Sequence, residues 1–197
     1  VFDGSHSGAQ VETAQTRPLN VYGASKLAGE QAVQAVSGEH WILRTSWVFG
    51  LHGANFLKTM LRLAGERETL AVVADQQGAP TSAALIADVT AHLVRARLRG
   101  EAVPASGCYH LAAAGITDWH AYARRVIARA AAAGLPTRVA AEDIRAISTA
   151  DYPTPATRPA NSRLDCGKLE QALGIVLPDW TLAVDQTVDL IMENRRS

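Results

Sequence analysis

Apolar residues along this chain switch repeatedly between helical and strand spacing, which predicts an α/β protein. Six stretches have the three-to-four-residue spacing of amphipathic helices: 18–36, 54–66, 82–98, 117–133, 165–173 and 179–194. Shorter apolar runs predict strands at 41–48, 69–73, 107–112 and around 137–140. Such alternation is typical of a mainly parallel sheet covered by helices.

Polar residues mark the starts of several predicted helices. Ser82 precedes a helical apolar set that begins at Leu85, and its hydroxyl can accept a backbone N–H there. Thr117 and Asp165 can cap their helices in the same way.

The segment 151–160 contains Pro153, Pro155 and Pro159, which exclude helix and central strand. This segment is therefore either an ordinary surface loop or a rigid wall over a binding site.

Composition excludes two classes of partner. The 197 residues include 19 basic and 19 acidic side chains, and 48% of them are apolar, enough for a real core. A formal net charge of zero argues against nucleic-acid and membrane-surface binding, which leave a basic excess. The sequence has no apolar run long enough for a membrane-spanning helix.

Tyr22 and Lys26 are the most informative residues for chemistry. Residues four apart on a helix share one face. A tyrosine hydroxyl, with a pKa of about 10, is a poor acid at neutral pH, and a nearby ammonium favours its phenolate. Such a pair suits proton transfer during carbonyl reduction or alcohol oxidation, although an exposed pair that only solvates a helix face fits the same pattern.

Several stretches in series resemble the extended short-chain dehydrogenase/reductase family. They are VFDG (1–4), PLNVYGASKLAGE (18–30), RTSWVF (44–49), NF (55–56), DQQGAPT (75–81) and YPTPATRPANSRL (152–164). Within that family they are similar to the dTDP-4-dehydrorhamnose reductases. The resemblance runs from residue 1 to about residue 180.

The resemblance implies the C-terminal part of a Rossmann-type doubly wound parallel sheet plus a smaller α/β substrate-binding domain. Residues 1–50 would be the remainder of the dinucleotide-binding domain, with the Tyr-x-x-x-Lys helix. Residues 51–197 would be mainly substrate-binding, with some segments returning to the Rossmann domain. The family's glycine-rich phosphate loop has no match here, so we expect the C-terminal two-thirds of a longer enzyme.

The resemblance also implies a reaction, the reduction of dTDP-4-dehydro-6-deoxy-L-mannose to dTDP-L-rhamnose by NADPH or NADH. This is the last step of dTDP-rhamnose biosynthesis, which supplies lipopolysaccharide O-antigen, and it implies a cytoplasmic enzyme. Tyr22 would donate the proton, and Lys26 would also hydrogen-bond the nicotinamide ribose. Thr45, Ser46 and Val48 would lie beside the cofactor, although strand alternation lets only some of them face it.

Candidates for the sugar end of the substrate are Trp47, at the end of the first predicted strand, and Asn55 and Phe56, which follow that strand. Trp47 is either a core residue or a flat partner for the hexose, whose N–H could form one hydrogen bond. Asn55 and Phe56 open the next helix, and Asn55 is its N-cap, a ligand of the diphosphate or sugar, or both.

The loop with Gln76, Gly78, Pro80 and Thr81 is either a turn with a helix cap or, as the resemblance implies, a wall of the nucleotide site. Arg158, in the proline-rich segment, is the first candidate for the diphosphate, because a pyrophosphate needs cationic or amide donors. Arg163 could instead brace that segment through a salt bridge.

The sequence predicts no metal site, because His52, His110 and His120 lack metal-ligand spacing. Some members of the resembled family are dimers bridged by magnesium between surface carboxylates. Ala84 and Leu190 stand at the aligned positions, which leaves magnesium unsupported and a homodimer open.

Two other functions fit the same pattern. A related nucleotide-sugar epimerase or dehydratase shares the Tyr-x-x-x-Lys pair, and a non-catalytic regulatory subunit shares the fold. The RTSW turn and the PTPA loop favour the reductase, and the intact tyrosine–lysine pair argues against the regulatory subunit.

Overall fold

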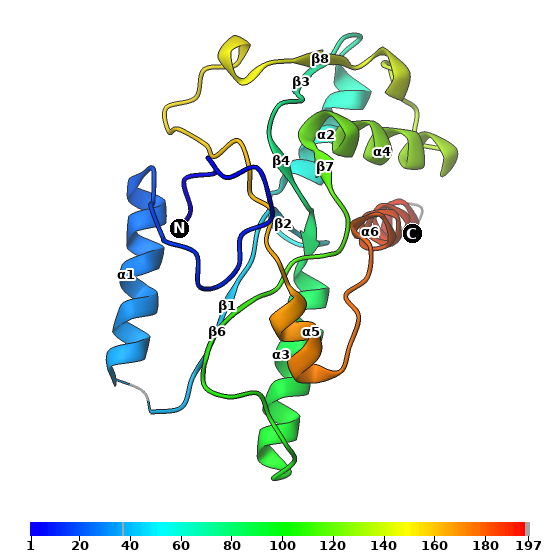
Figure 1. The fold of residues 1–197 in the computed structure, drawn as a ribbon. Helices are drawn as coiled ribbons and strands as arrows, with labels where there is room; N and C mark the ends of the chain where they lie inside the picture. Colours follow the sequence, from blue (N-terminus) through cyan, green and yellow to red (C-terminus); the bar gives the residue numbers. More distant parts are fainter. Residues whose placement is uncertain (37, 196–197) are drawn as a thin grey trace.

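A computed structural model describes residues 1–36 and 38–195 (Figure 1). Its helices are α1 (Val21–Val36), α2 (Phe56–Glu66), α3 (Ala83–Leu98), α4 (Trp119–Ala132), α5 (Gly167–Leu173) and α6 (Trp180–Asn194). Its strands are β1 (Trp41–Arg44), β2 (Val48–Phe49), β3 (Ala71–Val73), β4 (Gln77–Gly78), β5 (Thr81–Ser82), β6 (Gly107–His110), β7 (Thr117–Asp118) and β8 (Arg145–Ile147). Short 3-10 turns cover Ala141–Asp143 and Thr149–Asp151. All six predicted helices are therefore confirmed, each beginning one to three residues later than expected.

The strands pair in twos within the described residues, and most of the pairs are parallel. Strands β1 and β6, β2 and β5, and β3 and β8 are parallel, whereas β4 and β7 are antiparallel. The predicted α/β class with mainly parallel pairing is confirmed.

Two of the strand predictions are corrected by the structure. The strand expected around 137–140 is wrong, since Val139 is buried in the core and the Arg138 N–H donates to the Ala64 carbonyl (2.7 Å). The apolar residues at 137–140 reflect burial without strand pairing. The next strand along the chain is β8, which pairs with β3. The strand expected at 41–48 is split into β1 and β2, because Trp47 has a left-handed φ of 50° that interrupts the extended backbone.

The caps were predicted with mixed success. Ser82 does cap α3, since its Oγ accepts the Leu85 N–H at 3.1 Å. The prediction that Thr117 caps α4 was wrong, because Asp118 caps this helix by accepting the Ala121 N–H at 2.8 Å. Asp165 lies one residue before the N-cap position of α5, which Cys166 occupies.

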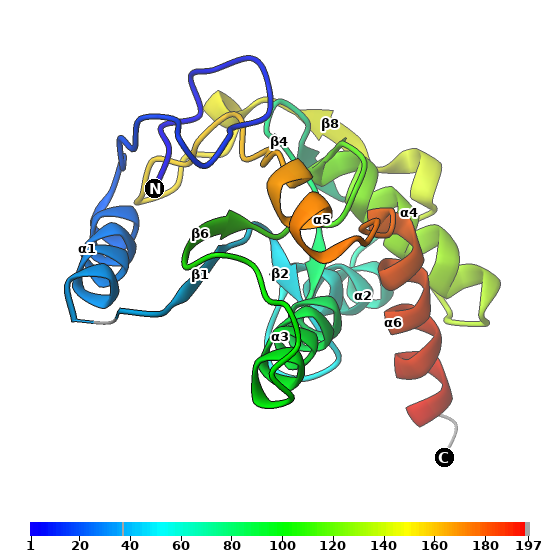
Figure 2. The same cartoon turned by 60° about the horizontal axis from the view of Figure 1, so that its bottom comes forward.

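Apolar side chains form two buried clusters. The larger one joins α2, α4 and α6 with β3, through residues such as Leu57, Val126 and Val184. The smaller one joins α3, α5 and β6, through residues such as Leu93, Tyr109 and Leu169. Figure 2 shows α2, α4 and α6 gathered at one end of the molecule, with α1 at the other.

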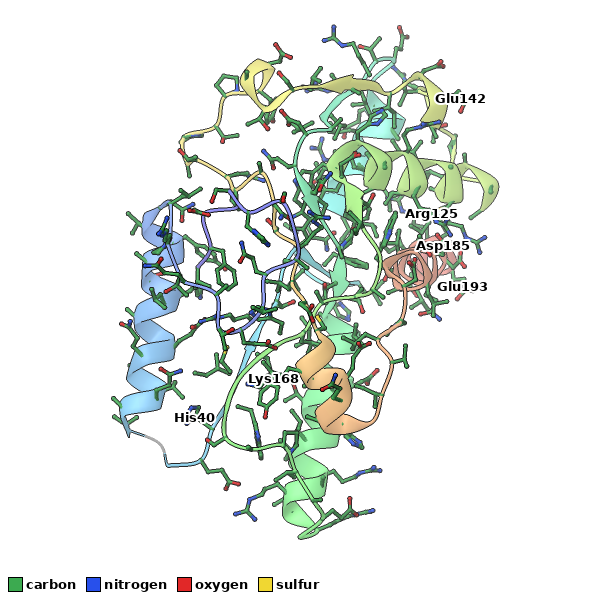
Figure 3. All side chains as sticks on the ribbon, viewed as in Figure 1. His40, Arg125, Glu142, Lys168, Asp185 and Glu193 are labelled. Atoms are coloured by element: carbon green, nitrogen blue, oxygen red, sulfur yellow. The ribbon has the colours of Figure 1, made fainter. Side chains whose placement is uncertain are left out.

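Two ion pairs of the same kind hold α4 against α6. The Arg125 guanidinium donates to Asp185 at 2.9 and 2.5 Å, and Arg129 does the same to Asp189 at 2.7 and 2.5 Å. Figure 3 shows Arg125 and Asp185 between the two helices. The pairs are one helical turn apart on both helices, so they fix the register of the α4–α6 contact.

Helix α1 is attached differently, at the edge of the fold (Figures 1 and 2). Gly23 is its one buried residue, and Pro18 packs against it so closely that an added Cβ would lie 3.0 Å away. A bidentate ion pair between Glu30 and Arg44, at 2.9 and 2.6 Å, ties the helix to β1. Among the described helices, none has the length and apolar character that a membrane span requires.

Candidate functional site

The start of α1 places Tyr22 and Lys26 together on an open face. The Asn20 Oδ1 accepts the Gly23 N–H at 2.8 Å, which fixes the first turn of the helix. The Lys26 Nζ lies 5.2 Å from the centroid of the Tyr22 ring. Both side chains are exposed, Tyr22 by 71%, so a ligand can reach the hydroxyl and the ammonium.

The other residues expected beside a cofactor, Thr45, Ser46 and Val48, lie in the turn between β1 and β2 and at the first position of β2. The side chains of Thr45 and Val48 are exposed, whereas Ser46 is half-buried. Only some of the three can therefore face a cofactor, as strand alternation predicted. The Ser46 Oγ is buried and has no hydrogen-bond partner in the described part of the chain. Ser46 also lines a small cavity of about 90 Å³ that Arg163 borders. An unpaired buried hydroxyl is costly unless something else pairs with it.

Trp47 lies in an aromatic cluster with Trp119 and Phe56. The sequence predicted site roles for Trp47 and Phe56 but none for Trp119. The Trp47 indole stacks on Trp119, with ring centroids 3.8 Å apart and planes 17° from parallel. Phe56 packs on Trp119, with ring centroids 4.7 Å apart. The side chain of Trp119 also donates its N–H to the Gln76 Oε1 at 3.1 Å.

Trp119 was missed because only its tertiary contacts distinguish it. In the sequence it follows a helix cap, where an aromatic residue is unremarkable. Its position directly after Asp118, at the start of an amphipathic helix, was the signal available. That position predicts a residue at the edge of the core, but it does not predict that Trp119 stacks on Trp47.

A cleft of about 1100 Å³ lies beside this cluster. Its walls come from α2, β3, β8 and the proline-rich segment, and they include Phe56, Gln76, Trp119 and Arg158. Three residues predicted to bind substrate therefore meet at one cleft. Tyr152 and Thr154 line it as well, so the proline-rich segment is a wall of the cleft.

Other predicted substrate residues are not among those that line the cleft. Thr81 is fully buried, where its Oγ1 accepts the Ala113 N–H at 3.2 Å, and Pro80 beside it is buried too. Gly78 packs against the Trp47 indole so closely that an added Cβ would lie 2.6 Å from Trp47 Cε2. Gly78 therefore supports the Trp47 indole, and a role for Thr81 and Pro80 toward a ligand stays a prediction.

Asn55 has its amide engaged within the protein. Its Oδ1 accepts the Lys58 N–H at 3.1 Å, which makes it the N-cap of α2 as predicted. Its Nδ2 donates to the Gly50 carbonyl at 2.8 Å. A role for Asn55 toward a ligand stays a prediction.

The two arginines of the proline-rich region differ in their partners. Arg158 is exposed and has no ion-pair partner in the part of the chain that the structure describes. Arg163 braces the segment, but through hydrogen bonds from its guanidinium to the Asn161 Oδ1 at 3.0 Å and to the Ser7 carbonyl. The salt bridge expected for Arg163 is therefore replaced by neutral acceptors.

One hydrogen bond links the open face of α1 with the cleft. The Asn20 Nδ2 donates to the Thr157 carbonyl at 3.0 Å, within the segment that lines the cleft. The chain just before this segment is held by Asp75, whose carboxylate accepts the Thr149 hydroxyl at 2.6 Å. The hydroxyl and backbone N–H of Thr149 lower the pKa of Asp75. The carboxylate therefore stays charged and keeps its hold on Thr149 at neutral pH.

No group of three or more potential metal ligands occurs among residues 1–36 and 38–195. Ala84 and Leu190 are both exposed on their helices and carry no oxygen ligand. The expectation about magnesium stays a prediction.

Comparisons with known proteins agree with one another. The profile of a family described as the RmlD substrate binding domain matches residues 1–192. The dTDP-4-dehydrorhamnose reductase of Escherichia coli K12 is 50% identical over 189 residues, which cover 96% of this chain and 62% of that protein.

Two solved structures are also similar. A dTDP-4-dehydrorhamnose reductase from Clostridium acetobutylicum superposes with a TM-score of 0.84 at 31% identity, covering 97% of this chain and 62% of the other. One from Bacillus anthracis, in complex with NADP, has a TM-score of 0.81 at 32% identity, covering 95% and 61%. The chain thus spans less than two thirds of the length of each of these relatives.

Proposed function

The chain belongs to the family of the RmlD substrate binding domain, and on this premise we propose that the complete protein is a dTDP-4-dehydrorhamnose reductase. It would reduce dTDP-4-dehydro-6-deoxy-L-mannose to dTDP-L-rhamnose with NADPH or NADH. The observation that carries the proposal is the open Tyr22–Lys26 pair, 5.2 Å from ammonium to ring centroid. The name of the Escherichia coli relative supports the choice of substrate.

The residues around the β1–β2 turn fit a nicotinamide dinucleotide. Tyr22, Lys26, Thr45 and Val48 are exposed, and the unpaired Ser46 hydroxyl is a buried polar group that a bound cofactor could satisfy. When bound, the reduced nicotinamide supplies the hydride that C4 of the sugar accepts. The NADP complex of the Bacillus anthracis relative supports this cofactor class.

The protein side of the reaction is a proton transfer. The Tyr22 hydroxyl donates its proton to the oxygen that becomes the C4 alcohol. Lys26 stabilises the phenolate that remains, because an opposite charge nearby favours it. A positioned acid of this kind contributes about a hundred- to ten-thousand-fold in rate.

The cleft beside the aromatic cluster would hold the nucleotide sugar. Its volume of about 1100 Å³ suits a ligand of that size. Arg158, exposed and unpaired in the described chain, would bind the diphosphate, while Phe56 and Gln76 lie on the wall. Trp47 would contact the hexose.

The proposal extends to location and assembly. The complete protein would act in the cytoplasm, with its nucleotide-sugar substrate. A homodimer of it would not be bridged by magnesium at Ala84 and Leu190, because alanine and leucine side chains offer no oxygen to a hard cation.

Oxidation of reduced nicotinamide by the full-length protein tests the function. With the 4-ketosugar nucleotide present, we expect one equivalent of cofactor oxidised for each dTDP-L-rhamnose formed. An epimerase or dehydratase would convert a nucleotide sugar without net consumption of cofactor, and a regulatory subunit would show no turnover. Either result would contradict the proposal.

A further inference from the structure

The two stacked indoles differ in what their N–H groups do. The Trp119 N–H donates to Gln76, whose Nε2 in turn donates to the Thr149 Oγ1 at 3.0 Å. The Trp47 N–H has no hydrogen-bond partner in the described residues, and it is not among the buried unpaired atoms. One indole is therefore anchored by its edge, whereas the other keeps a donor that no described residue pairs with and that is not fully buried.

Trp47 is confined on several sides. Its backbone has a left-handed φ of 50°, and its carbonyl accepts the Thr81 N–H at 3.2 Å. Its ring packs against the backbone of Gly78, where no Cβ would fit. Trp119 covers one ring face at a centroid distance of 3.8 Å. A sugar can stack on that face only if Trp119 moves away.

Trp119 itself is held firmly. It is the first residue of α4, whose N-terminus is capped by Asp118. The next turn of the helix is rooted in the core by Tyr122, which is fully buried. The anchor through Gln76 reaches Thr149 and, through it, Asp75. A ligand that displaced Trp119 would therefore lose binding free energy.

We propose that Trp119 is a positioning residue, which holds the Trp47 indole by stacking so that its free N–H, rather than the covered ring face, meets the hexose. The proposal rests on the function proposed above, in which Trp47 contacts the sugar. An indole N–H only donates, so its partner on the hexose is a hydroxyl or carbonyl oxygen. Positioning of this kind matters because a displacement of about 1 Å at a reacting group can cost about a hundredfold in rate.

Two ligands that differ by the hexose give the test. Titration calorimetry on the full-length protein would measure the Kd of dTDP-L-rhamnose and of dTDP. In Trp119→Leu we expect dTDP-L-rhamnose to bind about tenfold more weakly, the scale of one lost hydrogen bond, with the dTDP constant within about twofold. Trp119→Phe keeps a ring on Trp47 and should recover most of the loss. The control is Trp41→Phe, because the Trp41 indole donates to the Pro104 carbonyl at 3.0 Å, outside the aromatic cluster.

Circular dichroism supplies a readout independent of ligand. Closely stacked indoles couple in the far ultraviolet, so the wild type should show an exciton couplet that Trp41→Phe keeps. Both Trp119 variants should lose it. A wild type without the couplet would overturn the proposal, as would equal weakening of both ligands or unchanged binding of dTDP-L-rhamnose in Trp119→Leu.

A second variant covers failure of Trp119→Leu to fold, judged by loss of its cooperative thermal transition. Gln76→Met removes the acceptor of the Trp119 N–H at similar volume, and it should weaken dTDP-L-rhamnose about threefold more than dTDP. Equal effects on both ligands would overturn the proposal. Binding of dTDP-L-rhamnose without ketosugar reduction by the wild type would instead contradict the proposed function, and the titrations would still decide the role of Trp119.

Discussion

Helices α1 and α4 are similar in length, with 16 and 14 residues, and opposite in their surroundings. Helix α4 buries five residues between α2 and α6, whereas α1 buries one glycine. Each carries a tyrosine near its start, 71% exposed at Tyr22 and 1% exposed at Tyr122. The same side chain is therefore available to a ligand on one helix and sealed in the core on the other.

The difference extends to how each helix is attached. Helix α4 is held by apolar packing, reinforced by its ion pairs with α6. Helix α1 is held by polar contacts, chiefly Glu30 with Arg44 and Asn20 with Thr157. Burial raises the pKa of Tyr122 well above its ordinary value, so that hydroxyl stays protonated. The comparison teaches that exposure, more than residue type, separates a tyrosine that can do chemistry from one that packs.

Matched alanine substitutions should give the largest contrast between the two helices. Tyr122→Ala empties a fully buried site and should lower the free energy of unfolding by about 3–5 kcal/mol. Tyr22→Ala removes an exposed ring and should change it by less than about 0.5 kcal/mol. Chemical denaturation of both variants measures this. Similar losses would mean that α1 is packed as α4 is, and would break the comparison.

The ion pair that ties α1 to β1 should have an intermediate effect on the free energy of unfolding. The side chains of Glu30 and Arg44 are each 12% exposed, so Glu30→Gln leaves a largely buried guanidinium without its carboxylate. We expect a loss of about 2 kcal/mol in unfolding free energy, because buried donors of the guanidinium lose their acceptor. The control is Glu66→Gln, because its pair with Arg62 is 58% and 53% exposed and contributes less than about 0.5 kcal/mol. Equal effects in the two variants would show that the α1 attachment is a surface contact.

His110, the last residue of β6, should make the stability of the fold depend on pH. It is fully buried, and its Nδ1 donates to the Gln10 carbonyl at 2.9 Å. Burial, with a smaller contribution from Arg44, lowers its pKa below the ordinary 6.5, although Glu12 opposes this. The unfolded chain then takes up the proton first, so stability is full above pH 6.5 and falls below it.

Urea unfolding at about pH 7.5 and 5.5 measures that dependence, with a limit of about 1.4 kcal/mol per pH unit. His110→Gln should remove most of the decline, and His52→Gln, at an exposed position, should leave it in place. A decline that persists in His110→Gln would assign it to other groups.

The fold was predictable where its signals are local. Helical spacing and the caps at Ser82 and Asn55 depend on residues close in sequence, and all six helices were found. The strands β4, β5 and β7 contain two residues each, so they carry too little periodicity to be read. They exist because tertiary packing brings their partners close. Val139 misled for a related reason, since burial without pairing gives the same apolar signal as a strand.

The site was predictable only in part. Phe56, Gln76 and Arg158 do meet at one cleft, although they lie far apart in the sequence. Trp119 was missed, whereas Pro80 and Thr81, predicted as a wall of the nucleotide site, are buried and do not line this cleft, so their role toward a ligand stays a prediction. Trp119 could not be found because only its stacking on Trp47 distinguishes it, and Trp47 itself has a left-handed φ of 50°. A conformation of that kind in a non-glycine residue leaves no mark in the sequence.

The most direct test of the account is a matched pair of tyrosine-to-phenylalanine substitutions. In the full-length protein, Tyr22→Phe should lower the turnover number for the 4-ketosugar nucleotide at least about a hundredfold, with KM little changed, because it removes the proton donor. Tyr122→Phe removes a buried hydroxyl that has no partner in the described chain, so it should leave turnover within about twofold. Near-normal turnover in Tyr22→Phe would contradict the assignment of Tyr22 as the proton donor.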